Sequence, residues 1–160
     1  MNIFVVYQAQ MKLTPSKINT FLFFKLPSAY IMGVRVKSIS ESTCLTTVTY
    51  RWINQNPFSS MFWAVQGMAA ELSTGTMVMA KIKQSGKNIS MLVAANRATF
   101  HKKATGKIQF LCNDGHLLDQ AVERAIRTKE GQTIWMKSEG TNSSGEVVSV
   151  FEFEWTIKLR

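Results

Sequence analysis

The spacing of apolar residues changes several times along the chain, and each period predicts one kind of element. A helical repeat lies between the pair Thr14-Pro15 and Pro27, with apolar residues at Ile18, Phe21, Leu22 and Leu26. Threonine is a frequent helix cap, and proline fits the first helical turn. We therefore predict an amphipathic helix that begins at this pair and that Pro27 ends.

A second amphipathic helix is predicted between Asp114, which can cap it, and Gly131, which can close it. Its apolar face contains Leu117, Leu118, Ala121, Val122 and Ala125. On the opposite face, Glu123 and Arg127 lie four residues apart, a spacing at which charged side chains can pair along a helix.

Six segments alternate between apolar and polar residues or are rich in β-branched and aromatic residues, as strands are. They span residues 34–39, 44–52, 89–100, 107–112, 133–139 and 147–158. The last two flank Asn142-Ser143-Ser144-Gly145, a strong hairpin-turn sequence. Since pairs of strands alternate with helices, the pattern predicts an α+β fold with an antiparallel sheet of about six strands.

Residues 60–72 are apolar around nearly the whole circumference of a helix. Their alanine and methionine content favours helix, and the missing polar face is typical of a helix buried on most sides. We expect Ser59 or Ser60 to cap this helix and Thr74-Gly75-Thr76 to end or bend it, and we leave the state of residues 77–83 open. A sheet wrapped around this central helix would bury it well.

The composition is that of one folded domain. The chain has 160 residues, of which 46% are hydrophobic and 18% charged, whereas a disordered chain has the opposite balance. No repeat or linker divides it, so we assign residues 13–160 to a single domain and residues 1–12 to an N-terminal extension, either disordered or a strand. Met1 and Met11 both fit the first residue of the natural chain.

Several classes of protein do not fit this composition. Two cysteines, Cys44 and Cys112, and two histidines, His101 and His116, supply neither a disulfide framework nor a metal-ligand cluster, so we expect no metal. The first ten residues lack the basic start of a signal peptide, and no apolar stretch is long enough to span a membrane. We expect a cytoplasmic protein with no membrane partner.

Glu71 is the only charged residue between Trp52 and Ala80. On a helix it shares a face with mostly small residues, namely Ala64, Gly67, Met68 and Gly75. An apolar setting raises the pKa of a carboxyl group, which makes Glu71 a candidate general base or nucleophile. Alternatively, the helix ends there, and Glu71 reaches water or pairs with a lysine or arginine.

The loop before this helix is rich in amide and hydroxyl groups, from Asn54, Asn56, Ser59 and Ser60. Together with the free N–H groups of a helix N-terminus, such donors can polarise a carbonyl or hold an oxyanion. The same residues are also ordinary turn and capping residues, which is the alternative explanation.

The segment from Asn56 through Phe62-Trp63-Ala64 to Glu71, with two strands before it and four after it, resembles the hotdog-fold acyl-CoA thioesterases. It is more closely similar to an uncharacterised thioesterase-like branch of that superfamily, a domain of unknown function. Phenylacetate-type members have an Asn, a His-Gly-Gly six residues later, and an Asp or Glu nine residues after the His. Asn56 and Glu71 fall at those spacings, whereas Phe62 replaces the His, and Trp63-Ala64 replace the glycines.

The resemblance covers about Leu26 to Arg160 and implies a hotdog fold, with the sheet wrapped around the central helix. It implies that Glu71 activates a water or attacks a thioester, that Asn56 orients the water or the carboxylate, and that N–H groups at the helix start hold the oxyanion. Further substrate-binding candidates are Ser59, Ser60, Trp63, Ala64, Gly67 and, on the next strand, Ser90. Hotdog domains pair through their sheets, so a homodimer or a dimer of dimers is implied.

The net charge of +9 has several interpretations. Arg97, Lys102 and Lys103, near a basic turn, can hold the phosphates of coenzyme A, which enters as part of a substrate and not as a cofactor. A merely solvated turn is the simplest alternative. Most aromatic residues lie in apolar segments away from this turn, so we expect no nucleic-acid partner.

Two functions remain. The first is a thioesterase that hydrolyses an acyl-CoA or a related thioester with the carboxylate of the central helix. The second is a hotdog protein without catalysis, which binds an acyl ligand or acts as an assembly scaffold.

Overall fold

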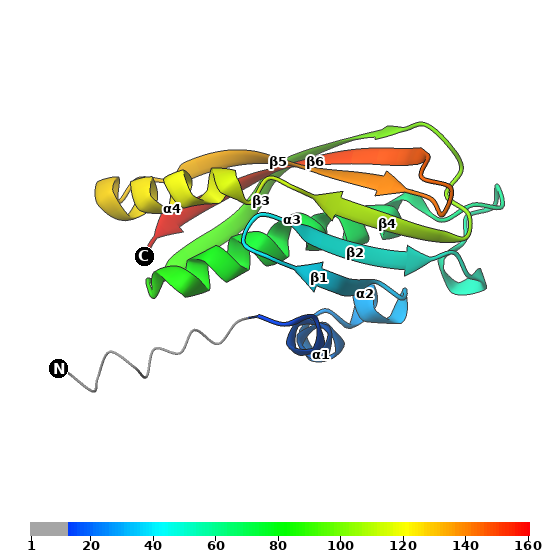
Figure 1. The fold of residues 1–160 in the computed structure, drawn as a ribbon, viewed down its shortest axis with the longest axis horizontal. Helices are drawn as coiled ribbons and strands as arrows, with labels where there is room; N and C mark the ends of the chain where they lie inside the picture. The colour runs from blue at the N-terminus through cyan, green and yellow to red at the C-terminus, as the bar shows by residue number, and fades with distance from the viewer. Residues whose placement is uncertain (1–12) are drawn as a thin grey trace.

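A six-stranded antiparallel sheet forms the centre of the molecule, in the strand order β1-β2-β4-β5-β6-β3 (Figure 1). The computed structural model describes residues 13–160. The strands are β1 (Arg35–Ile39), β2 (Cys44–Thr49), β3 (Ile89–Phe100), β4 (Lys107–Cys112), β5 (Gln132–Thr141) and β6 (Val147–Leu159). The helices are α1 (Pro15–Lys25), α2 (Pro27–Ile31), α3 (Trp63–Ser85) and α4 (His116–Thr128), with a 3₁₀ turn, η2, at Trp52–Asn54.

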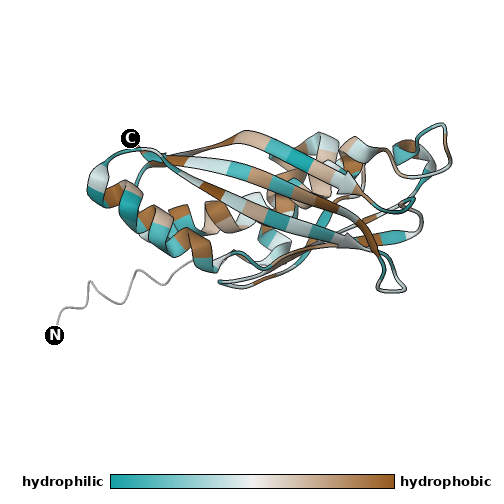
Figure 2. Cartoon of the chain, turned by 90° about the horizontal axis from the view of Figure 1, so that it is seen from above, coloured by the Kyte–Doolittle hydropathy of each residue, from teal (hydrophilic) through white to brown (hydrophobic). Residues whose placement is uncertain are grey.

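The central helix α3 packs against every strand of the sheet, and α4 packs against β5, β6 and α3. Apolar and polar residues alternate along the strands (Figure 2), and in β6 every second residue from Phe151 to Ile157 is buried. This arrangement confirms the predicted α+β fold and is that of the hotdog fold. No helix within residues 13–160 is long and apolar enough to cross a membrane.

The predicted strand 44–52 is too long, because β2 ends at Thr49. The buried amide of Asn54 accepts a hydrogen bond from Arg51 N at 2.8 Å and donates to Thr49 O at 2.9 Å and Met32 O at 3.1 Å. These bonds take up backbone groups that a continuing strand would pair, so the chain turns into η2.

The central helix is longer than predicted and starts later. It begins at Trp63, with Phe62 as the cap residue and no capping side chain, so neither Ser59 nor Ser60 caps it. It continues through Thr74-Gly75-Thr76 to Ser85 and ends at Gly86, which has a left-handed φ of 65°. The Thr74 hydroxyl donates to Glu71 O at 2.9 Å and accepts from Trp155 Nε1 at 3.0 Å, so a contact with the sheet holds the helix where local propensity is weak.

Polar contacts also join α3 to the sheet, which the apolar pattern did not predict. Ser73 donates to Ser138 at 2.8 Å, and Ser149 donates to Gln66 at 2.9 Å, with all four side chains buried. On the β2 side, the Thr46 hydroxyl donates to Ala69 O at 2.7 Å.

The first helix is confirmed in position, but its predicted apolar face is partly wrong. Thr14 caps α1, accepting from Lys17 N at 3.4 Å, and α1 ends at Lys25, so Pro27 starts α2. Ile18 and Leu22 are buried, whereas Phe21 and Leu26 are exposed. The helix lies against β1 at the edge of the sheet, where it has too few neighbours to cover a wide apolar face (Figure 1).

The second predicted amphipathic helix is α4, with Leu118, Val122 and Ala125 buried. Its cap residue is Gly115 and not Asp114, whose carboxylate instead accepts from Lys137 N at 2.6 Å. The helix closes at Lys129 rather than Gly131. The predictions for residues 1–12 lie outside the described part of the chain.

Candidate functional site

Glu71 is the ninth residue of α3, in the middle of the helix. Fourteen further helical residues follow it, so the alternative that the helix ends at Glu71 is wrong. No lysine, arginine or histidine forms an ion pair with it within residues 13–160. The central helix therefore carries an unpaired carboxylate.

The surroundings of Glu71 favour its protonated form. The side chain is exposed to solvent on one side of the single chain, and the protein around its other sides raises the pKa of the carboxyl group by desolvation. A carboxylate that is unpaired, reachable and easily protonated can act as a base.

The small residues near Glu71 allow the helix to approach the sheet closely. A Cβ atom at Gly75 would lie 2.9 Å from Cζ2 of Trp155, and one at Gly67 would lie 3.5 Å from Cε1 of Phe151. Gly67 and Gly75 therefore accommodate side chains of β6, and we do not assign them the role of clearing space beside the carboxylate.

Asn56 organises the loop that leads into α3. Its Oδ1 atom accepts from Phe58 N at 2.9 Å and Ser60 N at 3.3 Å, and its Nδ2 atom donates to the hydroxyl of Ser60 at 3.0 Å. Ser59 lies at the tip of this loop, exposed and with a left-handed φ of 58°. The polar groups of Asn56 and Ser60 thus bind each other and set the shape of the loop.

The first N–H groups of α3 are available for a ligand. The N–H groups of Val65 and Gln66 donate to Phe62 O, at 3.0 and 3.3 Å. In the part of the chain that the structure describes, the N–H groups of Trp63 and Ala64 have no acceptor. These two donors lie at the positive end of a long helix, where they can hold an oxyanion.

A single chain does not bring these donors to Glu71. Glu71 follows Trp63 by eight residues on one straight element, which places them about 12 Å apart along the axis. Asn56 and Ser60 lie before the helix and are no closer in the chain. Along the chain, the predicted site residues therefore form two groups: the start of α3 with its loop, and the turn that carries Glu71.

Ser90 belongs to neither group. The part of α3 that follows Glu71 is about 21 Å long, at about 1.5 Å per residue. Ser90 follows at the start of β3, where its hydroxyl donates to Lys158 O at 3.2 Å. Its predicted part in substrate binding stays untested.

The three predicted phosphate-binding cations each have a partner. Arg97 forms two bonds to the Glu152 carboxylate, at 2.6 and 2.9 Å, which lower the pKa of Glu152. Lys102 pairs with Glu146, and Lys103 donates to Phe58 O at 2.9 Å. Lys103 is thus attached to the loop before α3, whereas Arg97 lies on β3.

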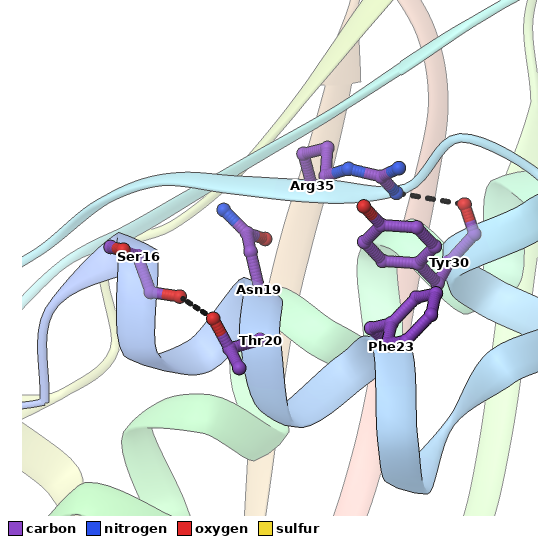
Figure 3. Close-up of a pocket in the computed structure, with 6 residues that line it drawn as sticks. All are labelled: Ser16, Asn19, Thr20, Phe23, Tyr30 and Arg35. Carbon is purple, nitrogen blue, oxygen red and sulfur yellow. Dashed lines mark hydrogen bonds between the residues drawn. The ribbon is translucent and has the colours of Figure 1, made fainter.

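A cavity of about 510 Å³ lies away from this site. It is an open hollow between α1, α2 and β1, around Arg35 (Figure 3). No sequence motif predicted a binding site at these residues. The available signal was the charge distribution, since the first 40 residues contain no Asp or Glu.

Comparison with known proteins identifies the family of this chain and supports its fold. A family model described as a domain of unknown function, DUF4442, matches residues 15–157, and the chain belongs to this family. No curated protein shows a significant sequence match.

Solved structures share the fold at low sequence identity. A protein of unknown function from Pseudomonas aeruginosa, described as a probable thioesterase, has a TM-score of 0.78 at 18% identity and covers 91% of this chain and 97% of its own. A protein of unknown function from Chlorobaculum tepidum has a TM-score of 0.79 at 18% identity, covering 92% and 98%. A thioesterase from Haemophilus influenzae has a TM-score of 0.71 at 10% identity, covering 92% of each chain. The chain therefore has a thioesterase-like hotdog fold.

Proposed function

We propose that this protein hydrolyses an acyl-CoA or a related thioester, with Glu71 as the catalytic carboxylate. The observation that carries the proposal is the unpaired carboxylate in the middle of the central helix, whose pKa is raised by desolvation. A thioesterase-like fold supports the reaction class, because the solved neighbours include proteins described as thioesterases.

We further propose that the site is completed by a second copy of the chain. Glu71 and the free N–H groups of Trp63 and Ala64 are about 12 Å apart in one chain, too far to act on one thioester carbonyl. Two antiparallel central helices, side by side across a twofold axis, would place Glu71 of one subunit near the helix start of the other.

The sheet has an edge suited to this pairing. β3 is the last strand of the sheet, is 12 residues long and pairs only with β6 among the described strands. Its second half, from Asn96 to Phe100, is exposed on both faces. Such an edge is a template for pairing with another strand.

In the proposed reaction, Glu71 takes a proton from water while the water oxygen attacks the thioester carbon. The carbonyl electrons move to its oxygen, which the N–H groups at the partner's helix start stabilise. Collapse of this intermediate breaks the C–S bond, and the thiolate receives the proton from Glu71. In the variant of this step, a Glu71 oxygen attacks the thioester carbon, the C–S bond breaks, and the thiolate leaves a mixed anhydride on Glu71. Water then hydrolyses the anhydride, and its attack on the Glu71 carboxyl carbon would place a labelled oxygen in the Glu71 carboxylate.

Asn56 acts in this scheme as a positioning residue. Its side chain bonds within the loop hold Ser60 and the residues before α3, and so orient the first helical N–H groups. Lys103 bonds to the same loop and has no carboxylate partner among the described residues, so it is the cation that we propose for a coenzyme A phosphate. Lys102 and Arg97 would have to leave their carboxylate partners.

The test is release of free thiol from a panel of acyl-CoA esters by the full chain. We expect Glu71→Gln to lower kcat by about 10²–10⁴-fold, the usual contribution of a general base. Glu123→Gln, which removes an exposed carboxylate on α4, is the matched control and should leave turnover unchanged. Turnover that survives the loss of Glu71 would refute the catalytic assignment.

The alternative function is acyl binding without turnover. It is favoured by the exposed aromatic rings of Phe62 and Trp63, which are in edge-to-face contact at 5.9 Å between ring centroids at the start of α3. If no ester in the panel is hydrolysed but acyl-CoA quenches tryptophan fluorescence in the wild type and not in Trp63→Leu, the binding function replaces the enzymatic one.

A further inference from the structure

Arg35 lines the β1 side of the hollow between α1, α2 and β1 (Figure 3). Nη1 of Arg35 donates to Tyr30 O at 2.8 Å and to Val34 O at 2.7 Å, and the guanidinium carbon lies 3.5 Å from the centre of the Tyr30 ring. These contacts fix the plane of the guanidinium. Within residues 13–160, its Nε and Nη2 atoms have no acceptor, and no carboxylate pairs with it.

The other groups around the hollow suit an anion. The hydroxyls of Ser16 and Thr20 line it, and Thr20 donates to Ser16 O at 3.0 Å, which orients its oxygen. Phe23 also lines the hollow, in edge-to-face contact with the Tyr30 ring at 5.1 Å between ring centroids. A planar, pre-oriented guanidinium with free N–H groups is well suited to bind a phosphate oxygen pair.

The chain segment that forms the hollow carries only positively charged side chains. The first 40 residues contain five lysines and arginines and no acidic residue. Lys17 and Lys25 lie on α1, and Lys37 lies on β1, all exposed. The charged residues of this segment are therefore all basic, and together they attract anions.

Large apolar side chains lie on the same two helices, exposed to solvent. Phe23 is 53% exposed and Phe24 is 70% exposed, and Phe21, Leu26 and Ile31 are also exposed. Exposed aromatic residues beside lysines are the composition with which a helix lies in a membrane interface. A small soluble anion would make use of Arg35 and leave these residues unexplained.

We propose that the α1–α2 face binds the surface of an anionic phospholipid membrane, with a lipid phosphate on Arg35 and the exposed apolar residues of α1 and α2 in the headgroup region. Lys17 and Lys25 add attraction to the anionic surface. This replaces the expectation from the sequence of no membrane partner, which rested on the absence of a spanning segment. β1 and β3 are opposite edges of the sheet, so the face stays accessible when two copies pair through β3.

The test is co-sedimentation of the full chain with vesicles of phosphatidylcholine alone and of phosphatidylcholine with phosphatidylglycerol, at low and high salt. We expect binding to the anionic vesicles only, and loss of that binding as salt rises. Lys17→Gln with Lys25→Gln should weaken it by about 25-fold, at roughly fivefold for each basic residue.

Two further variants, each with a control, separate the contribution of the exposed phenylalanines from that of Arg35. Phe23→Ser with Phe24→Ser should abolish binding, whereas Phe58→Ser, which changes an exposed phenylalanine in the loop before α3, should not. Arg35→Gln should weaken binding, and Lys129→Gln, at the residue that follows α4, is its charge-matched control. Thermal unfolding of each variant shows whether it is folded.

Three results would overturn the proposal. The first is no vesicle binding, or equal binding by all variants. The second is binding of inorganic phosphate or glycerol 3-phosphate that depends on Arg35, without vesicle binding, which would assign the hollow to a soluble phosphate. The third is a smaller assembly of the Phe23→Ser/Phe24→Ser variant in the absence of lipid, which would make this face an interface between copies.

Discussion

Desolvation of the Glu71 carboxylate lowers the stability of the folded chain, and the same desolvation makes the group a stronger base. Desolvation raises its pKa in the folded state above the value in the unfolded chain, so the folded state holds the proton more tightly. The contribution of Glu71 to the free energy of unfolding is therefore fully present at low pH, where the group is protonated. It is lost as the pH rises through the raised pKa. In its ionised form Glu71 therefore destabilises the fold.

Replacing Glu71 by glutamine should consequently stabilise the protein while it removes turnover. We expect Glu71→Gln to unfold at a higher Tm than the wild type at pH 8, and the difference to shrink toward zero below about pH 4, where the carboxyl group is protonated in both states. Thermal unfolding followed by circular dichroism at several pH values measures this. A lower Tm for the variant at pH 8 would show that Glu71 has a stabilising partner.

Cys44 and Cys112 are buried and directly opposite each other on β2 and β4. Burial raises the pKa of each thiol to about 12, so the thiolate that reacts with disulfides is absent near neutral pH. We expect no reaction with a disulfide reagent at pH 8 in the folded chain, and reaction of two thiols per chain in guanidinium chloride. Fast reaction of native protein would contradict the burial of these residues.

The central helix is held by polar as well as apolar contacts with the sheet. Ser73 and Ser138 meet in a buried hydroxyl pair between α3 and β5, where neither side chain can reach water. A buried polar group that loses its partner costs more than the bond itself contributes, because its hydration is not recovered. The pair therefore fixes which residue of α3 faces β5.

Ser73→Ala tests this contact. We expect it to lower the free energy of unfolding by about 1–3 kcal/mol, because the Ser138 hydroxyl loses its donor. Ser73→Ala with Ser138→Ala should cost less than the sum of the two single changes, a coupling that urea denaturation of the four proteins measures. Additive effects would mean that the two hydroxyls do not interact.

The two edges of the sheet differ in a way that bears on assembly. At β1, the amide of Asn19 donates to Val36 O and accepts from Val36 N, both at 2.9 Å, and so takes the place of a neighbouring strand. At β3, no such cap is present within residues 13–160. One edge is closed to strand pairing and the other is open, which favours a dimer over an open-ended chain of copies.

We therefore expect the protein to behave as a dimer of about twice 18.0 kDa in light scattering coupled to gel filtration. Leu92 on β3 is 66% exposed, and Leu92→Asp should shift the equilibrium toward monomer and lower turnover with it. Leu117→Asp, a change of the same kind on α4, should do neither. A wild-type monomer at micromolar concentration that hydrolyses thioesters would contradict the shared site.

The candidate site could be predicted in part. The single acid in a long apolar segment pointed to Glu71 because charge is costly in a buried helix, and that argument needs only the sequence. The polar residues of the loop before α3 predicted hydrogen-bond donors for a substrate, but Asn56 and Ser60 bond mainly to each other. The groups without a hydrogen bond are the backbone N–H groups of Trp63 and Ala64. Side-chain composition carries no signal for a free N–H.

By itself, the sequence determined the class of fold, the six strands and the position of the central helix, since alternation and helical spacing follow from which residues must be buried. The tertiary structure decided what depends on contacts between distant residues. Trp155 holds α3 together through Thr74-Gly75-Thr76, and Asn54 ends β2 by bonding to Met32 and Thr49. The start of α3 at Trp63 in turn sets the distance from Glu71 to the first helical N–H groups, which is why we propose that a second chain completes the site.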